Sequence, residues 1–458
     1  MLRRHAPLAT VLVAVTLFAS ALTHSFLAEL AAASTSITVE SVPIVVTQPA
    51  STAGSYTGPG SCAAAACHGA VRQPPNSRIL QTEYTTWMAQ DRHARAAEVL
   101  STSVSVRMAK ILGIGTAASA PKCLACHSLE PAAGQKSHSF TNEGVSCEAC
   151  HGPASGWLGP HTTRGWTHAR SVALGMYDTK DLIKRTEKCL TCHLGTTEKF
   201  VDHEMIAAGH PDLVFDLEAF SAAMPRHWRA TTESDPYAPV RSFAVGQLVN
   251  LRASLERLAQ RTRGPNWPEY AELDCFACHH SLTRPQDSWR QSTGYGDRRP
   301  GNPPYNHSRW TTARHVLEAL EPAAAAQLAP LMTSIGREAR RLRADGGQIA
   351  TLVTQARSVL DASIAKAVLS KPDAAMTLRL LRGIASDAEE ISVRGERAAE
   401  QAAMAMETLY SASAARSSNA AVRTAFDELF QQFQSPSSYD PRRFVAQVRR
   451  IETTLGAR

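Results

Sequence analysis

The stretch Gly144-Val145-Ser146-Cys147-Glu148-Ala149-Cys150-His151-Gly152-Pro153 contains two cysteines separated by two residues, with a histidine directly after them. The same Cys-x-x-Cys-His pattern occurs at Cys123, Cys126 and His127; at Cys189, Cys192 and His193; and at Cys275, Cys278 and His279. In a further pair, Cys62 and Cys67 have four residues between them, and His68 follows directly. These five motifs, numbered one to five in chain order below, use all 10 cysteines of the 458 residues.

Cys-x-x-Cys-His is the pattern of covalent haem c attachment. The two thiols add to the two vinyl groups on one edge of the porphyrin, so they must lie about one short turn apart. The histidine that follows then lies beneath the iron, where its imidazole can bind as the proximal ligand. The sequence therefore predicts five covalently bound haems, with His68, His127, His151, His193 and His279 as proximal iron ligands.

Paired cysteines have two other common uses in proteins. An even number of cysteines in an exported protein can form disulfides, and Cys-x-x-Cys pairs can hold structural zinc. Neither use requires a histidine directly after every pair, so haem attachment is favoured for motifs two to five. In motif one the longer loop between Cys62 and Cys67 leaves a local disulfide open as the alternative.

A low-spin electron-transfer haem needs an axial ligand on each face of its iron. Apart from the proximal ligands and the N-terminal His5 and His24, the chain has ten histidines: His93, His138, His161, His168, His203, His210, His227, His280, His307 and His315. We expect the distal ligands among His93, His161, His210 and His203, followed by His280 and His138. Methionine is a weaker alternative ligand.

Position in the sequence supports this choice of distal ligands. His93 follows a stretch with helical periodicity, and His161 comes soon enough after His151 to fold over a neighbouring haem. His203 and His210 are seven residues apart, which on a helix would place them on one face. They could serve two different haems, or bind one haem and hydrogen-bond a propionate. His280 should point away from the iron of His279 and could reach the next haem.

The stretch Gly144–Pro153 resembles the multihaem cytochrome c-554 family. So do Trp87 with the later His93, and the stretch Asp202–Pro211. The resemblance covers residues 57 to 320 and implies multihaem packing and an electron-carrier role, in a family that includes carriers acting with hydroxylamine oxidoreductase. The chain departs from the family pattern in two ways. It has five motifs where the family's namesake carries four haems, and motif one has a longer loop.

The N-terminus has the composition of a secretory signal. Arg3, Arg4 and His5 form a positively charged head, and an apolar run without charges follows from Leu8 to Leu22. We assign residues 1–33 to a signal peptide, with an uncleaved membrane anchor as the alternative. Either reading places the protein in the periplasm or elsewhere outside the cytoplasm.

The fold is expected to be mainly α-helical. After a linker at 34–56, residues 57–320 should form a pentahaem domain with long loops and little sheet, and residues 321–458 a helical bundle without cysteine or histidine. Apolar residues from Ile349 to Val368 recur at helical spacing, and Lys371-Pro372-Asp373 should end that helix and cap the next.

The net charge of +7 does not by itself indicate an acidic partner. Each oxidised haem with two histidine ligands adds roughly one negative charge, so five haems nearly cancel the excess. We therefore expect redox proteins as electron donor and acceptor and no nucleic acid, with membrane association possible through the N-terminal segment. The predicted function is electron transfer. The alternatives are a multihaem oxidoreductase acting on a small nitrogen or sulfur compound at one open-faced haem, and a haem sensor or structural subunit.

Overall fold

The computed structural model describes residues 54–75, 77, 79–129, 131, 134–136, 139–229, 235–275, 277–279, 302–413, 420–434 and 438–456. In these residues helices alternate with loops, and the extended pairing consists of two isolated bridges, Tyr56 with Lys136 and Leu273 with Tyr305. The prediction of a mainly α-helical protein is confirmed.

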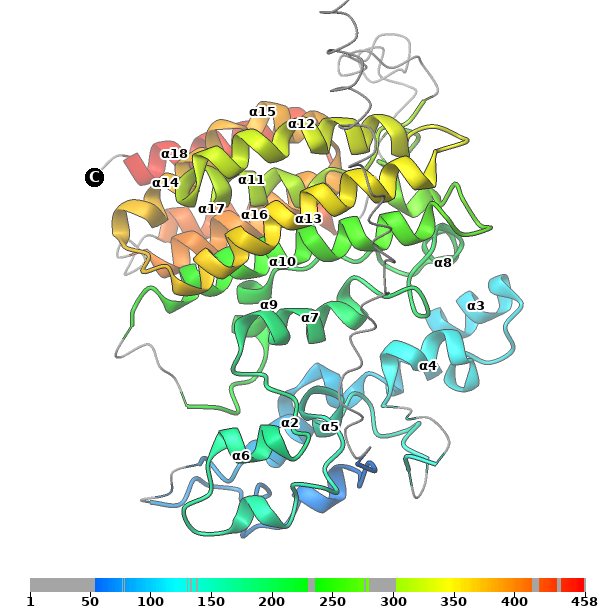
Figure 1. Ribbon diagram of the computed structural model, residues 1–458, viewed down its shortest axis with the longest axis vertical. Helices are drawn as coiled ribbons and strands as arrows, with labels where there is room; N and C mark the ends of the chain where they lie inside the picture. The colour runs from blue at the N-terminus through cyan, green and yellow to red at the C-terminus, as the bar shows by residue number, and fades with distance from the viewer. Residues whose placement is uncertain are drawn as a thin grey trace, which may run out of the picture. The chain divides into compact units, whose positions relative to one another are not determined.

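Short helices make up the part of the chain that carries motifs one to four (Figure 1). They are η1 Pro59–Cys62, α2 Glu83–Gln90, η2 Arg92–Arg95, η3 Glu98–Ser101, α3 Ser103–Leu112, η4 Ala117–Ser119, α4 Pro121–His127, α5 Cys147–His151, η5 Pro160–Thr162, α6 His168–Ala173, α7 Leu182–His193, α8 His203–Ala208, α9 Leu217–Ala223 and η6 Tyr270–Glu272. Motifs two, three and four each form the last turn of a helix, namely α4, α5 and α7. Because cysteines at i and i+3 lie on one helix face, the two thiols point the same way.

The helices from α10 onward, most of them longer, pack around one apolar core and are called the long helices below. They are α10 Ala238–Arg261, α11 Ser308–Leu320, α12 Pro322–Ala339, α13 Gly346–Leu369, α14 Ala374–Ser386, α15 Ala388–Val393, α16 Glu396–Ala412, α17 Ala420–Phe430, η9 Gln431–Phe433 and α18 Pro441–Gly456. Helix α10 packs on α13, α7 and α11, and α11 packs on α16 (Figure 1). The apolar core therefore already includes α10 and α11, ahead of residue 321. The domain division at 320 remains a prediction.

The apolar stripe predicted between residues 349 and 368 lies on α13. Ile349, Val353, Ala356 and Leu360 are buried in the core shared with the other long helices. The helix ends at Leu369, and the carboxylate of Asp373 accepts a hydrogen bond from the Met376 amide at 2.7 Å as the N-cap of α14. The predicted break is thus observed at residues 370–373.

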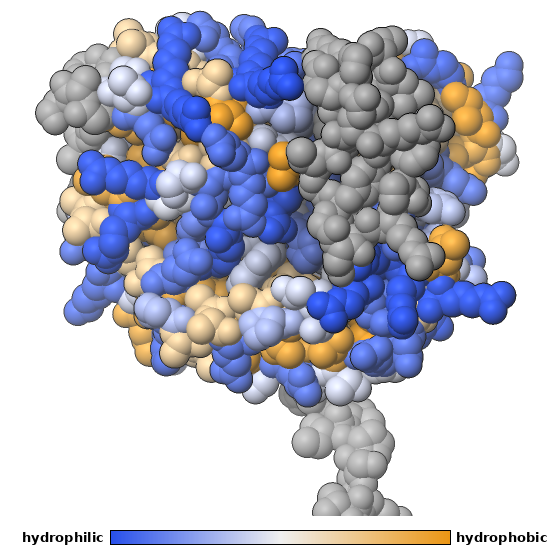
Figure 2. Space-filling model, turned by 90° about the horizontal axis from the view of Figure 1, so that it is seen from above, coloured by the Kyte–Doolittle hydropathy of each residue, from blue (hydrophilic) through white to orange (hydrophobic). Residues whose placement is uncertain are grey.

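The predicted signal peptide and most of the linker lie outside the described residues. Within the described ranges no helix combines the length and the apolar character needed to cross a membrane. Figure 2 shows one face of the molecule, on which hydrophilic side chains predominate and apolar ones are interspersed in small patches.

Candidate haem-binding site

The ten motif cysteines all lie in described parts of the chain, and none of them is paired in a disulfide. The described residues include no group of three or more His, Cys, Asp or Glu side chains that could hold a bare metal ion. What the fold does bring together are pairs of histidines, each pair containing one motif histidine.

Four histidine pairs have nearly the same spacing. The distances between ring centroids are 6.2 Å for His68–His161, 6.1 Å for His93–His193, 6.3 Å for His127–His210 and 6.3 Å for His203–His279. Imidazoles on opposite faces of one iron would have centroids about 6 Å apart, since each metal–nitrogen bond is about 2 Å and each centroid lies about 1 Å behind its nitrogen. The observed spacing therefore fits a six-coordinate iron between each pair.

Hydrogen bonds at Nδ1 orient the distal rings. His93 Nδ1 lies 3.0 Å from Asp91 Oδ1, His161 Nδ1 lies 2.5 Å from the Leu158 carbonyl oxygen, and His210 Nδ1 lies 2.7 Å from that of Pro211. A ring that donates Nδ1–H to such an acceptor keeps the lone pair of Nε2 free for a metal. This is the tautomer that an axial ligand requires.

The proximal rings are held in two ways. His68 Nδ1 lies 3.0 Å from Glu83 Oε2, and His127 Nδ1 lies 2.8 Å from the Ala96 carbonyl oxygen. His151 and His193 are instead partly buried, and burial lowers the pKa of each to about 4. Both imidazoles are therefore neutral near neutral pH, which is the form that can coordinate iron.

The segment around His93 contacts the residues just before motif three, so two separate parts of the family pattern lie side by side. Trp87, buried on α2, donates its indole N–H to the Val145 carbonyl oxygen at 3.2 Å, and the Val145 amide donates to the His93 carbonyl oxygen at 2.9 Å. His93 itself lies on η2, just after α2. Gly144 has φ +63°, and a Cβ there would lie 2.5 Å from His93 O, so only glycine fits.

The expectation that His203 and His210 share one face of a helix is wrong. Helix α8 ends at Ala208, and Gly209 adopts φ +115°, which places His210 beyond the helix end. The two histidines consequently face different partners, His279 and His127. Gly209 is the sequence signal that should have ended the predicted helix.

His151 differs from the other motif histidines, because within the described residues no second histidine ring stacks on it or meets its edge. His227 interacts with it electrostatically. His227 Nδ1 lies 3.3 Å from the Pro225 carbonyl oxygen, which leaves Nε2 available as in the distal ligands above. His227 was not among the expected ligands, and nothing in its local sequence distinguishes it.

Several spare histidines are engaged elsewhere. His168 Nε2 lies 2.8 Å from Asp178 Oδ1, and His315 binds the carboxylates of Glu318 and Asp387 through its two nitrogens. His307 is enclosed among the long helices, against Gly336 of α12. The expected ligands His138 and His280 lie outside the described residues.

Contacts between cysteines show which motifs are neighbours. The Cys62 side chain is a close neighbour of Cys147, and the Cys126 side chain is a close neighbour of Cys192. These contacts join motif one to motif three and motif two to motif four. Cys150 interacts electrostatically with Cys189, which joins motifs three and four.

Motif five is connected through the distal histidines. His203, which faces His279, begins α8, and His210, which faces His127, follows its end. Helix α8 therefore lies between the histidine pairs of motifs two and five. Together with the cysteine contacts, this gives a spatial order of motifs one, three, four, two and five.

The attachment motifs and facing imidazoles are those of a c-type cytochrome. The protein family described as "Cytochrome c554 and c-prime" matches residues 62–152. The cytochrome c-type protein NrfH of Wolinella succinogenes is 29% identical over 90 residues, which are 18% of this chain and 51% of that protein. The match thus spans about half the length of this relative. No solved structure matches.

Residues 62–152 are thus similar to c-type cytochromes of the cytochrome c554 family, as the sequence resemblance predicted. This match supports covalently bound haem c in this part of the chain.

Proposed function

We propose that the protein is an exported relay that carries electrons through five covalently bound haems. The observation that carries this proposal is the recurrent spacing of about 6 Å between histidine rings at motifs one, two, four and five. An iron held between two imidazoles has no vacant face for a substrate, so such sites favour electron transfer over chemistry on a bound molecule.

Each haem would be held by two cysteines and two histidines. The proposed sets are Cys62, Cys67, His68 and His161; Cys123, Cys126, His127 and His210; Cys147, Cys150, His151 and His227; Cys189, Cys192, His193 and His93; and Cys275, Cys278, His279 and His203. When bound, haem supplies reversible one-electron chemistry at its iron. The chain itself fixes the ligand tautomers through the hydrogen bonds at Nδ1.

The spatial order of the motifs supports a relay with two ends. Motif one stands at one end of this order and motif five at the other. Electrons would enter near one end and leave near the other, which requires a separate redox protein as donor and as acceptor.

A second candidate function rests on motif three. If His227 does not bind the iron opposite His151, that haem has one open face, where a small nitrogen or sulfur compound could react. The observation that favours this reading is that no described histidine ring contacts His151.

Electron paramagnetic resonance on the oxidised, haem-loaded protein separates the two functions, with mass spectrometry giving the haem count. We expect five haems and only low-spin ferric signals. His227→Ala should then produce one high-spin haem per chain, whereas the control His168→Ala should leave all signals low-spin. One high-spin haem in the unmodified protein would refute the relay and support the oxidoreductase.

Export is part of the same proposal and is tested separately. Mass spectrometry of the mature protein from the periplasmic fraction should show an N-terminus near residue 33, since the run from Leu8 to Leu22 would be removed. An intact N-terminus in the membrane fraction would identify an anchor instead. Recovery from the cytoplasm would contradict export.

A further inference from the structure

The segment that follows motif four turns back toward that motif. Helix α7 ends at His193, and Gly195 adopts φ +89°, where a Cβ would lie 2.7 Å from the Lys199 carbonyl oxygen. The Thr196 amide donates to this oxygen at 2.7 Å, and the Thr196 hydroxyl oxygen accepts from the Lys199 amide at 3.2 Å. The turn therefore requires glycine at 195, and its hydrogen bonds fix the backbone of Lys199.

The Lys199 side chain contacts two haem motifs. Its ammonium group donates to the carbonyl oxygen of Ala125, inside motif two, at 3.2 Å and to Cys192 Sγ of motif four at 3.3 Å. It also interacts electrostatically with Cys126, the second cysteine of motif two. Because Cys126 and Cys192 are close neighbours, one positive charge lies where two attachment sites meet.

The charge of Lys199 has no carboxylate in contact with it among the described residues. Glu198 precedes it in the chain but is exposed to solvent. Lys122, just before motif two, pairs with Asp202 at 2.6 Å, so these two charges largely cancel. Since Lys199 is half-buried, water and salt screen its field less than the field of a lysine on the open surface.

Haem attachment would leave this arrangement in place. In the proposed sets Cys126 binds the haem of motif two and Cys192 that of motif four, each through a thioether. A thioether sulfur is uncharged but still a weak acceptor, so the ammonium group can keep its contact with Cys192. The Ala125 carbonyl oxygen takes no part in attachment and continues to hold it. Lys199 thus supplies a fixed cation beside two haems.

We infer that Lys199 raises the reduction potentials of two adjacent haems together, those of motifs two and four. This inference rests on the proposed haem sites and assigns one step of the relay to a particular side chain. A reduced haem carries one positive charge fewer than an oxidised one, so a cation beside it favours the reduced form. Because the same ammonium group lies beside both attachment sites, both haems should be easier to reduce with Lys199 than without it.

The test is a spectroelectrochemical titration of single variants whose five haems have been confirmed by mass spectrometry. Lys199→Gln removes the charge but keeps a hydrogen-bond donor for the Ala125 carbonyl oxygen. We expect two haems to become harder to reduce by about tenfold in equilibrium constant, about 59 mV for each one-electron couple. Lys199→Met should give the same shifts, and Lys199→Arg should restore most of both potentials. Lys184→Gln, which changes an exposed lysine of α7, is the matched control and should alter neither.

His210→Met and His93→Met backgrounds identify the two haems, because each changes the iron ligand and raises the potential at motif two or motif four respectively. Unchanged potentials in a folded, five-haem Lys199→Gln protein would overturn the inference. A shift in Lys199→Met that is absent in Lys199→Gln would also overturn it, since the hydrogen bond and not the charge would then be responsible. A shift confined to haems other than these two would contradict the placement of the charge. A haem count below five in the unmodified protein would instead refute the relay.

Discussion

The residues from 54 to 175 and those from 238 to 456 build their interiors differently. In the first region the separate apolar cluster consists of Leu100, Ala109, Ala117 and Leu124, and α3, with 10 residues, is its longest helix. In the second region helices such as α10 and α13, of 24 residues each, share one continuous apolar core. The first region carries three haem motifs and the second carries one. Side chains alone thus account for one interior, while the other requires bound haem to supply apolar surface.

The largest expected effect tests this difference directly. Protein produced without haem attachment should lose ordered structure between residues 54 and 175, because too little apolar surface is buried there to offset chain entropy. The helices from 238 to 456 should remain folded. Limited proteolysis followed by mass spectrometry should yield a resistant C-terminal fragment, with haem-loaded protein as the control. Resistance of residues 54–175 to proteolysis in the haem-free protein would contradict this difference between the two regions.

Removing one distal ligand should affect one haem without unfolding either region. His161→Ala takes away the ring that faces His68 at 6.2 Å, so one haem should change from low spin to high spin. Electron paramagnetic resonance and visible absorption measure this change. Removal of the His315 side chain, which binds Glu318 and Asp387 on the long helices, is the control and should leave the haem spectra unchanged.

A core substitution should act on the second region alone. Leu360→Ala on α13 removes a fully buried side chain and should lower the free energy of unfolding of the long helices by about 2–5 kcal/mol. Leu369→Ala at the end of the same helix is the control, because Leu369 is 80% exposed. Thermal unfolding followed by circular dichroism gives both values. A changed haem spectrum in Leu360→Ala would show that the two interiors are coupled.

The smallest expected effect concerns pH. Burial lowers the pKa of His307 to about 3, whereas in the unfolded chain its pKa is about 6.5. Above pH 6.5 His307 is neutral in both the folded and the unfolded chain, so it does not make stability depend on pH. Below pH 6.5 the unfolded chain binds a proton at His307, whereas folded His307 stays neutral down to about pH 3. The free energy of unfolding therefore falls as the pH decreases through this range.

At pH 5 this contribution is about 2 kcal/mol, at about 1.4 kcal/mol per pH unit. Comparing the change in melting temperature between pH 7 and pH 5 for the unmodified protein and for His307→Leu isolates this contribution. His168→Leu serves as the reference variant. An equal loss of stability in His307→Leu would mean that other groups cause the acid sensitivity.

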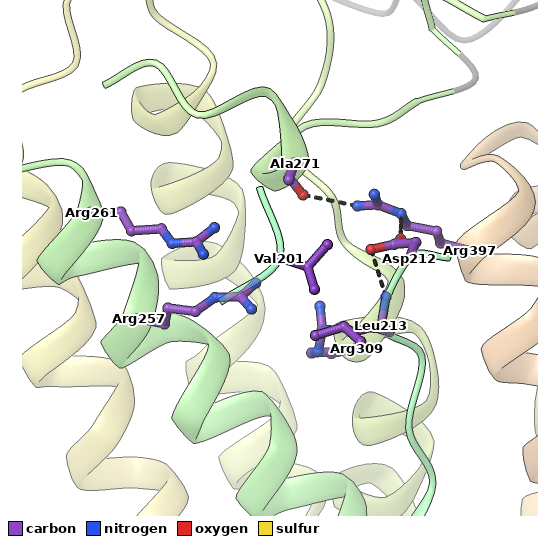
Figure 3. Close-up of a pocket in the computed structure, with 8 residues that line it drawn as sticks. All are labelled: Val201, Asp212, Leu213, Arg257, Arg261, Ala271, Arg309 and Arg397. Carbon is purple, nitrogen blue, oxygen red and sulfur yellow. Dashed lines mark hydrogen bonds and ion pairs between the residues drawn. The ribbon is translucent and has the colours of Figure 1, made fainter. Parts of the chain in front are cut away.

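The haem motifs and part of the helical fold follow from residues that are close together in the sequence. Motifs such as Cys147 to His151 are identified by spacing alone, and the stripe on α13 follows from helical periodicity. The partners of the motif histidines are set by packing between distant segments. Neighbouring residues in the sequence therefore do not reveal that His161 faces His68, or that His227 lies near His151. The same holds for Arg261 and Arg397, which line one hollow only after α10 and α16 have packed (Figure 3).

The histidine pairs also have a consequence for biosynthesis. In every pair one ring belongs to a segment made much later than the other: His161 follows motif three, and His193 belongs to motif four. As the chain emerges from its N-terminus, the haem of motif one would wait for its second ligand until three motifs have passed. Coordination alone would hold the cofactor weakly during this interval. Thioether bonds to Cys62 and Cys67 would retain it until the partner histidine arrives.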